Sequence, residues 1–296
     1  MRLAVACALL AVPGARADVL YLSTAFNATD YTPGTIPCCN TITQINNNGT
    51  LATAGISQTG ATGTETVFAT ADLANGQLHV VNQGSITGGA PVNVNVTSQA
   101  VIGDTITASG PLNGFDLGVN LTIHGSAFSD AQNDYTLLVV EALPAGSFDQ
   151  NYIYQNPLYA GFFVLGNDSF PGGTSGFGGL LSSGLYNTTN DLGNIPDGTN
   201  QVTLPVPFST LGSNFELVIA LDSYEFGATP SGDTWNNDYG DTVGVTLSTP
   251  SSVTLTSASN SFPGTTAAAA PEPATIGLLA AALAALAVCR RRVTNH

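Results

Sequence analysis

Basic side chains are almost missing from this chain of 296 residues. It contains no lysine, and its five basic residues are Arg2, Arg16, Arg290, Arg291 and Arg292. The interval between Ala17 and Cys289 holds all 20 acidic residues and no basic one except histidine. Proteins bind nucleic acids and anionic membranes through clustered lysine and arginine. This composition excludes both kinds of partner for the interval, which carries a strong negative charge that favours solubility.

Trypsin cleaves after lysine and arginine, so the interval from Ala17 to Cys289 contains no tryptic site. We expect it to survive digestion as one fragment even after denaturation, which mass spectrometry of the digest would show. Internal peptides from the interval would contradict this expectation.

Cysteine is also scarce, with four residues in the chain. Cys38 and Cys39 are the only two outside the terminal apolar segments. Neighbouring Cα atoms lie about 3.8 Å apart, closer than most disulfides allow, so a bridge between them would be strained. A vicinal disulfide, two thiols and an intermolecular bond all remain open, and a metal site would need further ligands.

Recognisable catalytic motifs are missing as well. His79 and His124 stand alone, and the chain has no His-Glu-x-x-His, no Gly-x-Ser-x-Gly and no phosphate-binding glycine loop. We therefore expect ordinary strand positions for both histidines and no enzymatic activity. Asp222 and Glu225 keep one alternative open, a secreted glycan hydrolase, because that chemistry needs only two carboxyl groups.

A polar stretch from Asp233 to Asp241 is predicted as a loop. Ca²⁺ takes six to eight oxygen ligands, and this stretch offers several, although without EF-hand spacing. The candidate ligands are Asp233, Asn237, Asp238 and Asp241. The same stretch carries Trp235 and Tyr239, on which a sugar ring could stack, so a carbohydrate-binding module is a second alternative function.

Short β-branched or aromatic runs recur between Gly, Asn, Asp and Pro clusters, which is the pattern of an all-β protein. Leu137–Val140 and Leu217–Leu221 are continuous apolar runs, typical of strands buried on both faces. We predict a single β-sandwich, jelly-roll-like, over residues 18–248. The expected strands are Val19–Phe26, Glu65–Thr70, Gln77–Val81, Pro91–Thr97, Ala100–Ala108, Leu117–His124, Tyr135–Ala142, Gly161–Leu165, Gln201–Phe208, Phe215–Leu221 and Thr242–Ser248. The glycine-rich stretch 166–200 is predicted to be irregular.

Both ends of the chain have the pattern of export segments. Residues 1–17 combine Arg2, an apolar stretch and an Ala-x-Ala site ending at Ala17, which predicts a secretory signal peptide. Residues 249–270 are rich in Ser, Thr and Ala and are predicted to form a stalk. Residues 274–289 are uncharged and apolar, and as a helix they would span about 24 Å, less than the bilayer core of about 30 Å. The arginines that follow place this end in the cytoplasm.

The C-terminal order of Pro271-Glu272-Pro273, the apolar run 274–289 and the cluster Arg290–Arg292 resembles the PEP-CTERM sorting signal of Gram-negative bacteria. The resemblance covers only about the last 25 residues. It implies recognition by exosortase, a membrane enzyme, with the apolar run as a transmembrane helix held until processing. It also implies an exported protein of the cell envelope or the exopolysaccharide matrix. We expect a structural or adhesive role there.

Overall fold

The structure is a computed structural model. It describes residues 20–29, 40–46, 51–59, 63–87, 92–129, 134–147, 157–166, 190–229 and 232–267. Contacts divide the chain into one unit, Met1–Thr266, and a second, Ala267–His296. The described fold is that of the first unit, because the second contributes only Ala267 to the described residues.

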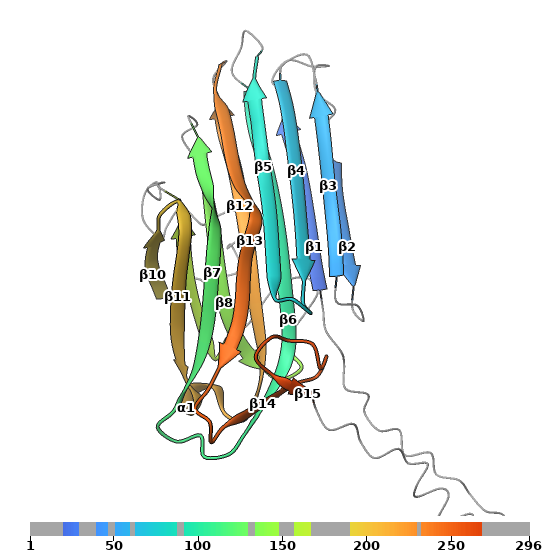
Figure 1. The fold of residues 1–296 in the computed structure, drawn as a ribbon. Helices are drawn as coiled ribbons and strands as arrows, with labels where there is room; N and C mark the ends of the chain where they lie inside the picture. The colour runs from blue at the N-terminus through green and yellow to red at the C-terminus, as the bar shows by residue number, and fades with distance from the viewer. Residues whose placement is uncertain are drawn as a thin grey trace, which may run out of the picture. The chain divides into compact units, whose positions relative to one another are not determined.

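The first unit is all-β, and its strands form two sheets (Figure 1). Sheet 1 has the order β10-β9-β8-β12-β6-β1-β2, with β14 pairing β6 and β15. Its strands are β1 (Leu20–Thr29), β2 (Asn40–Asn46), β6 (Val92–Ser109), β8 (Asp134–Pro144), β9 (Tyr159–Leu165), β10 (Asn190–Ile195), β12 (Asn214–Thr229), β14 (Thr254–Ser257) and β15 (Thr266–Ala267).

Sheet 2 has the order β11-β7-β13-β5-β4-β3. Its strands are β3 (Leu51–Thr59), β4 (Gly63–Asp72), β5 (Gln77–Ile86), β7 (Asp116–Ser129), β11 (Gly198–Pro207) and β13 (Thr234–Ser248). Within the described residues the one helix is the short α1 (Phe208–Leu211). The absence of a longer helix in this part agrees with a sequence that shows no helical period there.

Four antiparallel strand pairs are nested inside one another. They are β5 with β13, β6 with β12, β7 with β11 and β8 with β9. Successive pairs alternate between sheet 2 and sheet 1, so the chain between β5 and β13 resembles a long hairpin wound across both sheets. Strands that are far apart in the sequence therefore become neighbours. The pair of β9 and β10 is not one of these four and is parallel.

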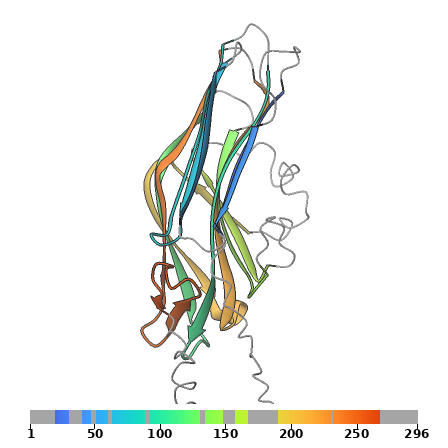
Figure 2. The same ribbon diagram turned by 90° about the vertical axis from the view of Figure 1, so that its right-hand side faces the viewer.

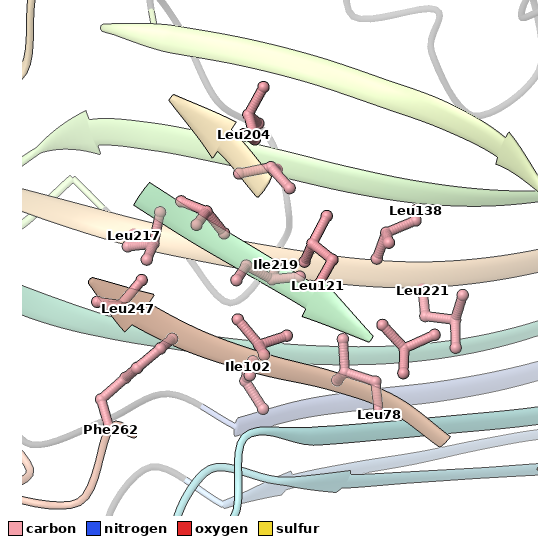
Figure 3. Close-up of a cluster of buried hydrophobic side chains, with 14 of the residues drawn as sticks. Leu78, Ile102, Leu121, Leu138, Leu204, Leu217, Ile219, Leu221, Leu247 and Phe262 are labelled. Carbon is pink, nitrogen blue, oxygen red and sulfur yellow. The ribbon is translucent and has the colours of Figure 1, made fainter. Parts of the chain in front are cut away.

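The two sheets form two layers with a shared apolar core between them (Figures 2 and 3). Side chains alternate along each strand, so every second residue points into this core. The pattern is regular in β4, where Val67, Ala69 and Ala71 are buried and Phe68 is exposed. The labelled members of the core are Leu78, Leu121, Leu204 and Leu247 from sheet 2, Ile102, Leu138, Leu217, Ile219 and Leu221 from sheet 1, and Phe262 from the segment after β14.

The prediction of an all-β protein is confirmed, and so is the burial of the two continuous apolar runs. Leu137–Val140 and Leu217–Leu221 are no more than 3% exposed at any residue. Two predicted strands, Pro91–Thr97 and Ala100–Ala108, are one strand, β6. They join because the ladders with β1 and β12 run unbroken through Ser98 and Gln99. The buried Ser98 hydroxyl donates to the carbonyl oxygen of Phe68 in sheet 2 at 2.7 Å.

The end of the first unit differs from the predicted stalk. Residues 249–266 fold back on the sheets, because Val253, Leu255 and Phe262 are buried in the core. Asp104, buried in β6, fixes the turn that follows β14 by accepting hydrogen bonds from the Ser259 hydroxyl, at 2.6 Å, and from its backbone N–H. The serines and threonines of this stretch therefore supply hydroxyl groups that hydrogen-bond within the turn, the last of them from Thr265.

Candidate functional site

The stretch from Asp233 to Asp241 is not the predicted loop: from Thr234 on it belongs to strand β13. Trp235, Asn237 and Tyr239 alternate with Asn236 and Asp238, which gives the stretch the period of a strand. Asn and Asp are depleted in strands, and this misled the sequence-based prediction. A register shift between Tyr239 and Val243 marks a bulge at the point where the stretch ends.

The candidate calcium ligands do not share one face of this strand. Asn237 is buried on the inner face, whereas Asp238 points to the outer face and is partly exposed. The Asp233 side chain is also partly exposed, and the Asp241 side chain lies outside the described residues. No group of three or more His, Cys, Asp or Glu side chains suited to a metal ion occurs among the described residues.

The candidate carbohydrate contacts are interior residues. Trp235 is 2% exposed and Tyr239 is 1% exposed, so neither ring presents a face to solvent. The Trp235 indole N–H donates to Asn82 Oδ1 at 2.9 Å. The indole also occupies the space beside Gly84, since a Cβ built on Gly84 would lie 1.9 Å from Trp235 Cζ2. Trp235 therefore serves the packing of sheet 2 rather than stacking on a sugar.

Asp222 and Glu225, the carboxyl pair considered for glycan hydrolysis, lie three residues apart in β12. In an extended strand this spacing directs them to opposite faces of the sheet. Both side chains are at least 97% buried. His79 is half-buried on the outer face of β5, and His124 is exposed on β7, where its Nδ1 contacts the Thr199 hydroxyl. The structure thus does not bring the two carboxyl groups together with a histidine.

Sequence reasoning missed that several carboxyl groups are buried. Glu141 in β8 and Asp222 in β12 lie on the face of sheet 1 that is turned away from the shared core, and Gln99 of β6 pairs with Asp222 in register. Burial and, to a smaller extent, the charge of the nearby Asp222 together raise the pKa of Glu141 to about 8. Burial also raises the pKa of Asp222 to about 7, against a lowering effect of a hydrogen bond from Gln99.

Glu65 in β4 is a second buried site, on the inner face of sheet 2 opposite Gly84. Its Oε1 has no hydrogen-bond partner, and burial raises its pKa to about 8. At neutral pH the Glu65 and Glu141 carboxyl groups are therefore mostly protonated. A local sequence pattern could not have revealed this, because Glu65 stands between two threonines, as a solvated strand residue would.

Several sequence-predicted sites lie outside the described residues. They are Cys38 and Cys39, the signal peptide 1–17, and the tail with Pro271, Glu272, Pro273 and Arg290–Arg292. In the part of the chain that the structure describes, no helix is long and apolar enough to cross a membrane. The expected transmembrane helix 274–289 falls beyond that part, so it stays a prediction.

An all-β body followed by a terminal Pro-Glu-Pro, apolar run and arginine cluster defines a β-rich protein with a C-terminal sorting segment. Residues 269–292 match the family model of the PEP-CTERM protein-sorting motif, which confirms the resemblance that the sequence suggested. Such signals mark exported proteins with a membrane-anchored precursor, and exosortase membrane enzymes process them. No curated protein matches the chain.

Proposed function

We propose that this chain is an exported, non-enzymatic protein with a structural or adhesive role in the cell envelope or exopolysaccharide matrix. The observation that carries the proposal is the sorting motif at residues 269–292. Residues 1–17 act as the signal peptide, residues 274–289 anchor the precursor, and exosortase then releases the body. We also propose that the two sheets form one jelly-roll-like sandwich, which the nested strand pairs support.

The length of the strands supports a structural role. β6 has 18 residues, β12 has 16 and β13 has 15, whereas strands in globular proteins usually have about 3–10. Each long strand is hydrogen-bonded to neighbours in its own sheet along most of its length, so local opening must break many ladder bonds together. A body of this kind suits a component that bears load outside the cell.

The sorting step is tested directly by asking whether cells remove the C-terminal tail from the mature protein. We expect mature protein from wild-type cells to lack Arg290–Arg292, because processing near Pro271–Pro273 would leave them in the membrane. Cells without exosortase should retain a precursor that still carries the three arginines. Mass spectrometry of the intact protein and of its C-terminal peptide from both strains would distinguish the two.

A single substitution tests the motif itself. Glu272→Gln alters the motif and leaves the apolar run and the arginines unchanged. We expect this variant to accumulate as precursor in wild-type cells. Arginines 290–292 still attached to the mature protein of wild-type cells would overturn the sorting proposal.

A further inference from the structure

A shallow depression of about 300 Å³ lies where β4, β5 and β13 run side by side in sheet 2. Three register rows form it. Thr64 faces Ser85 in one row, Glu65, Gly84 and Trp235 make up the middle row, and Thr66, Gln83 and Asn236 make up the third.

The depression opens on the outer face of the sheet, away from the shared core. Glu65 and Trp235 of the middle row are buried and point inward. Gly84 is half-buried, yet the Trp235 indole fills the space on its inner side. The exposed part of Gly84 therefore faces outward, and its backbone forms the floor between two rows of outward-pointing side chains.

The walls consist of hydroxyl and amide groups without charge. Thr64 and Ser85 share a hydrogen bond at 3.0 Å between their hydroxyl oxygens, and Ser57 and Thr66 share one at 2.9 Å. Each hydroxyl has one donor and two acceptor positions, so these pairs are held in place and still offer lone pairs to a ligand. Gln83 and Asn236 add amide donors and acceptors on the same side.

An aromatic platform stands beside the depression on the same face. Phe68 follows Thr66 by two residues in β4, so both side chains point outward, about 7 Å apart along the strand. Phe68 is 38% exposed, and among the described residues Leu51 is the one other large apolar side chain that is exposed. Its ring lies over Gly55 of β3, where a Cβ would come within 2.9 Å of Phe68 Cδ2, so the glycine keeps the ring close to the sheet.

We propose that this region of the outer face, the Phe68 platform with the adjoining hydroxyl- and amide-lined depression, binds a neutral glycan chain. A sugar ring offers an apolar C–H face for stacking on an aromatic ring and hydroxyl groups for hydrogen bonds, and the surface provides both partners. The charge of the body selects against anionic glycans, because it has many carboxylates and no basic side chain except histidine. The rings of Trp235 and Tyr239 are buried and point inward, so they do not stack on this glycan.

This inference rests on the proposed export, since it names the ligand class of the adhesive role. The two can fail separately, because mass spectrometry of the C-terminus tests sorting and a binding assay tests the surface.

Affinity electrophoresis in native gels tests the surface directly. The full chain, held in a detergent without a sugar head group, is run in gels with and without hydroxyethylcellulose or dextran as neutral polysaccharides, and with alginate as the anionic one. We expect retardation by at least one neutral polysaccharide and none by alginate. Phe68→Ala should weaken that binding about tenfold, the equivalent of one lost aromatic stacking contact. Thr66→Val, which keeps the shape and removes the hydroxyl, should weaken it about threefold to tenfold.

Leu51→Ala is the matched control. Leu51 is the other large exposed apolar side chain among the described residues; it lies in β3, on the same outer face of sheet 2 as Phe68, and is 53% exposed. We expect no change in binding from this variant. The fluorescence of Trp235, the single tryptophan, shows whether each variant is folded. Absence of retardation in both neutral gels, equal retardation by alginate, or binding by folded Phe68→Ala and Thr66→Val that matches the wild type would each overturn the proposal.

Discussion

Raising the pH from about 5 to about 9 should strongly destabilise the body of this protein. Three carboxyl groups ionise over this range, and their ionisation is costly in the folded state, where they are buried, but not in the unfolded chain. Burial raises the pKa of Glu65 and of Glu141 from 4.5 to about 8, and that of Asp222 from 3.8 to about 7. Between the two values of each group the folded state holds a proton that the unfolded state has lost. The contribution of each group is therefore fully present below its unfolded pKa and disappears as the pH passes its folded pKa.

The expected effect is large. A pKa difference of three units or more corresponds to about 4 kcal/mol per group. Three groups together reach on the order of 10 kcal/mol, which is comparable to the whole free energy of unfolding of an ordinary domain. Mutual repulsion among the other carboxylates acts in the same direction, because no lysine or arginine between Ala17 and Cys289 offsets it.

Urea denaturation at a series of pH values, followed by the fluorescence of the buried Trp235, would measure this dependence. Glu65→Gln and Glu141→Gln should each reduce the loss of stability between pH 5 and 9, because an amide cannot ionise. Asp116→Asn, at an exposed carboxyl group on β7, is the control and should leave the profile unchanged. A free energy of unfolding that stays constant across this range would show that these carboxyl groups are not buried as the structure has them.

The fold class could be predicted because it depends on local patterns. Alternation and β-branched runs are visible in any window, and the runs at Leu137 and Leu217 indicate two buried faces directly. The edge strands β2, β3 and β10 were missed, and β10 lies in the stretch 166–200 that was predicted to be irregular. Leu51–Thr59 is mostly small or polar, whereas Asn40–Asn46 contains four β-branched residues and its strand pattern was overlooked. β2 and β3 form strands because hairpin pairing with β1 and β4 supplies the ladder bonds.

The sites were harder to predict because their surroundings are assembled from distant strands. The environment of Asp222 is set by Gln99 of β6 and Glu141 of β8, which no window of the sequence contains together. If its stretch is taken for a loop, Trp235 is predicted to have an exposed ring. In the structure the stretch is a strand, and Trp235 lies with Asn237 and Tyr239 on its buried inner face. The sorting motif was predictable for the opposite reason, since its order and spacing are contiguous in the chain.

Gly84→Ala should be among the most destabilising single substitutions in sheet 2. The added Cβ would lie 1.9 Å from Cζ2, 2.3 Å from Cη2 and 2.5 Å from Cε2 of Trp235, far inside van der Waals contact. The indole cannot yield cheaply, because it is rigid, buried and held by the hydrogen bond to Asn82 at 2.9 Å. Displacing it would cost about 3–5 kcal/mol, as in the loss of a large core side chain, and would leave the buried Asn82 oxygen without its donor.

Gly244→Ala is the matched control, since Gly244 is also a strand residue of sheet 2 but its Cβ would meet Thr122 only at 3.7 Å, an ordinary contact. We expect it to change the free energy of unfolding by less than about 1 kcal/mol. In a Trp235→Ala background, Gly84→Ala should also become nearly neutral, because the clashing ring is gone, and a double-mutant cycle followed by circular dichroism would show this coupling. Equal effects of the two glycine substitutions would mean that the indole does not fill the inner side of Gly84. The depression would then no longer have to open on the outer face, and the placement of the glycan site would fail with it.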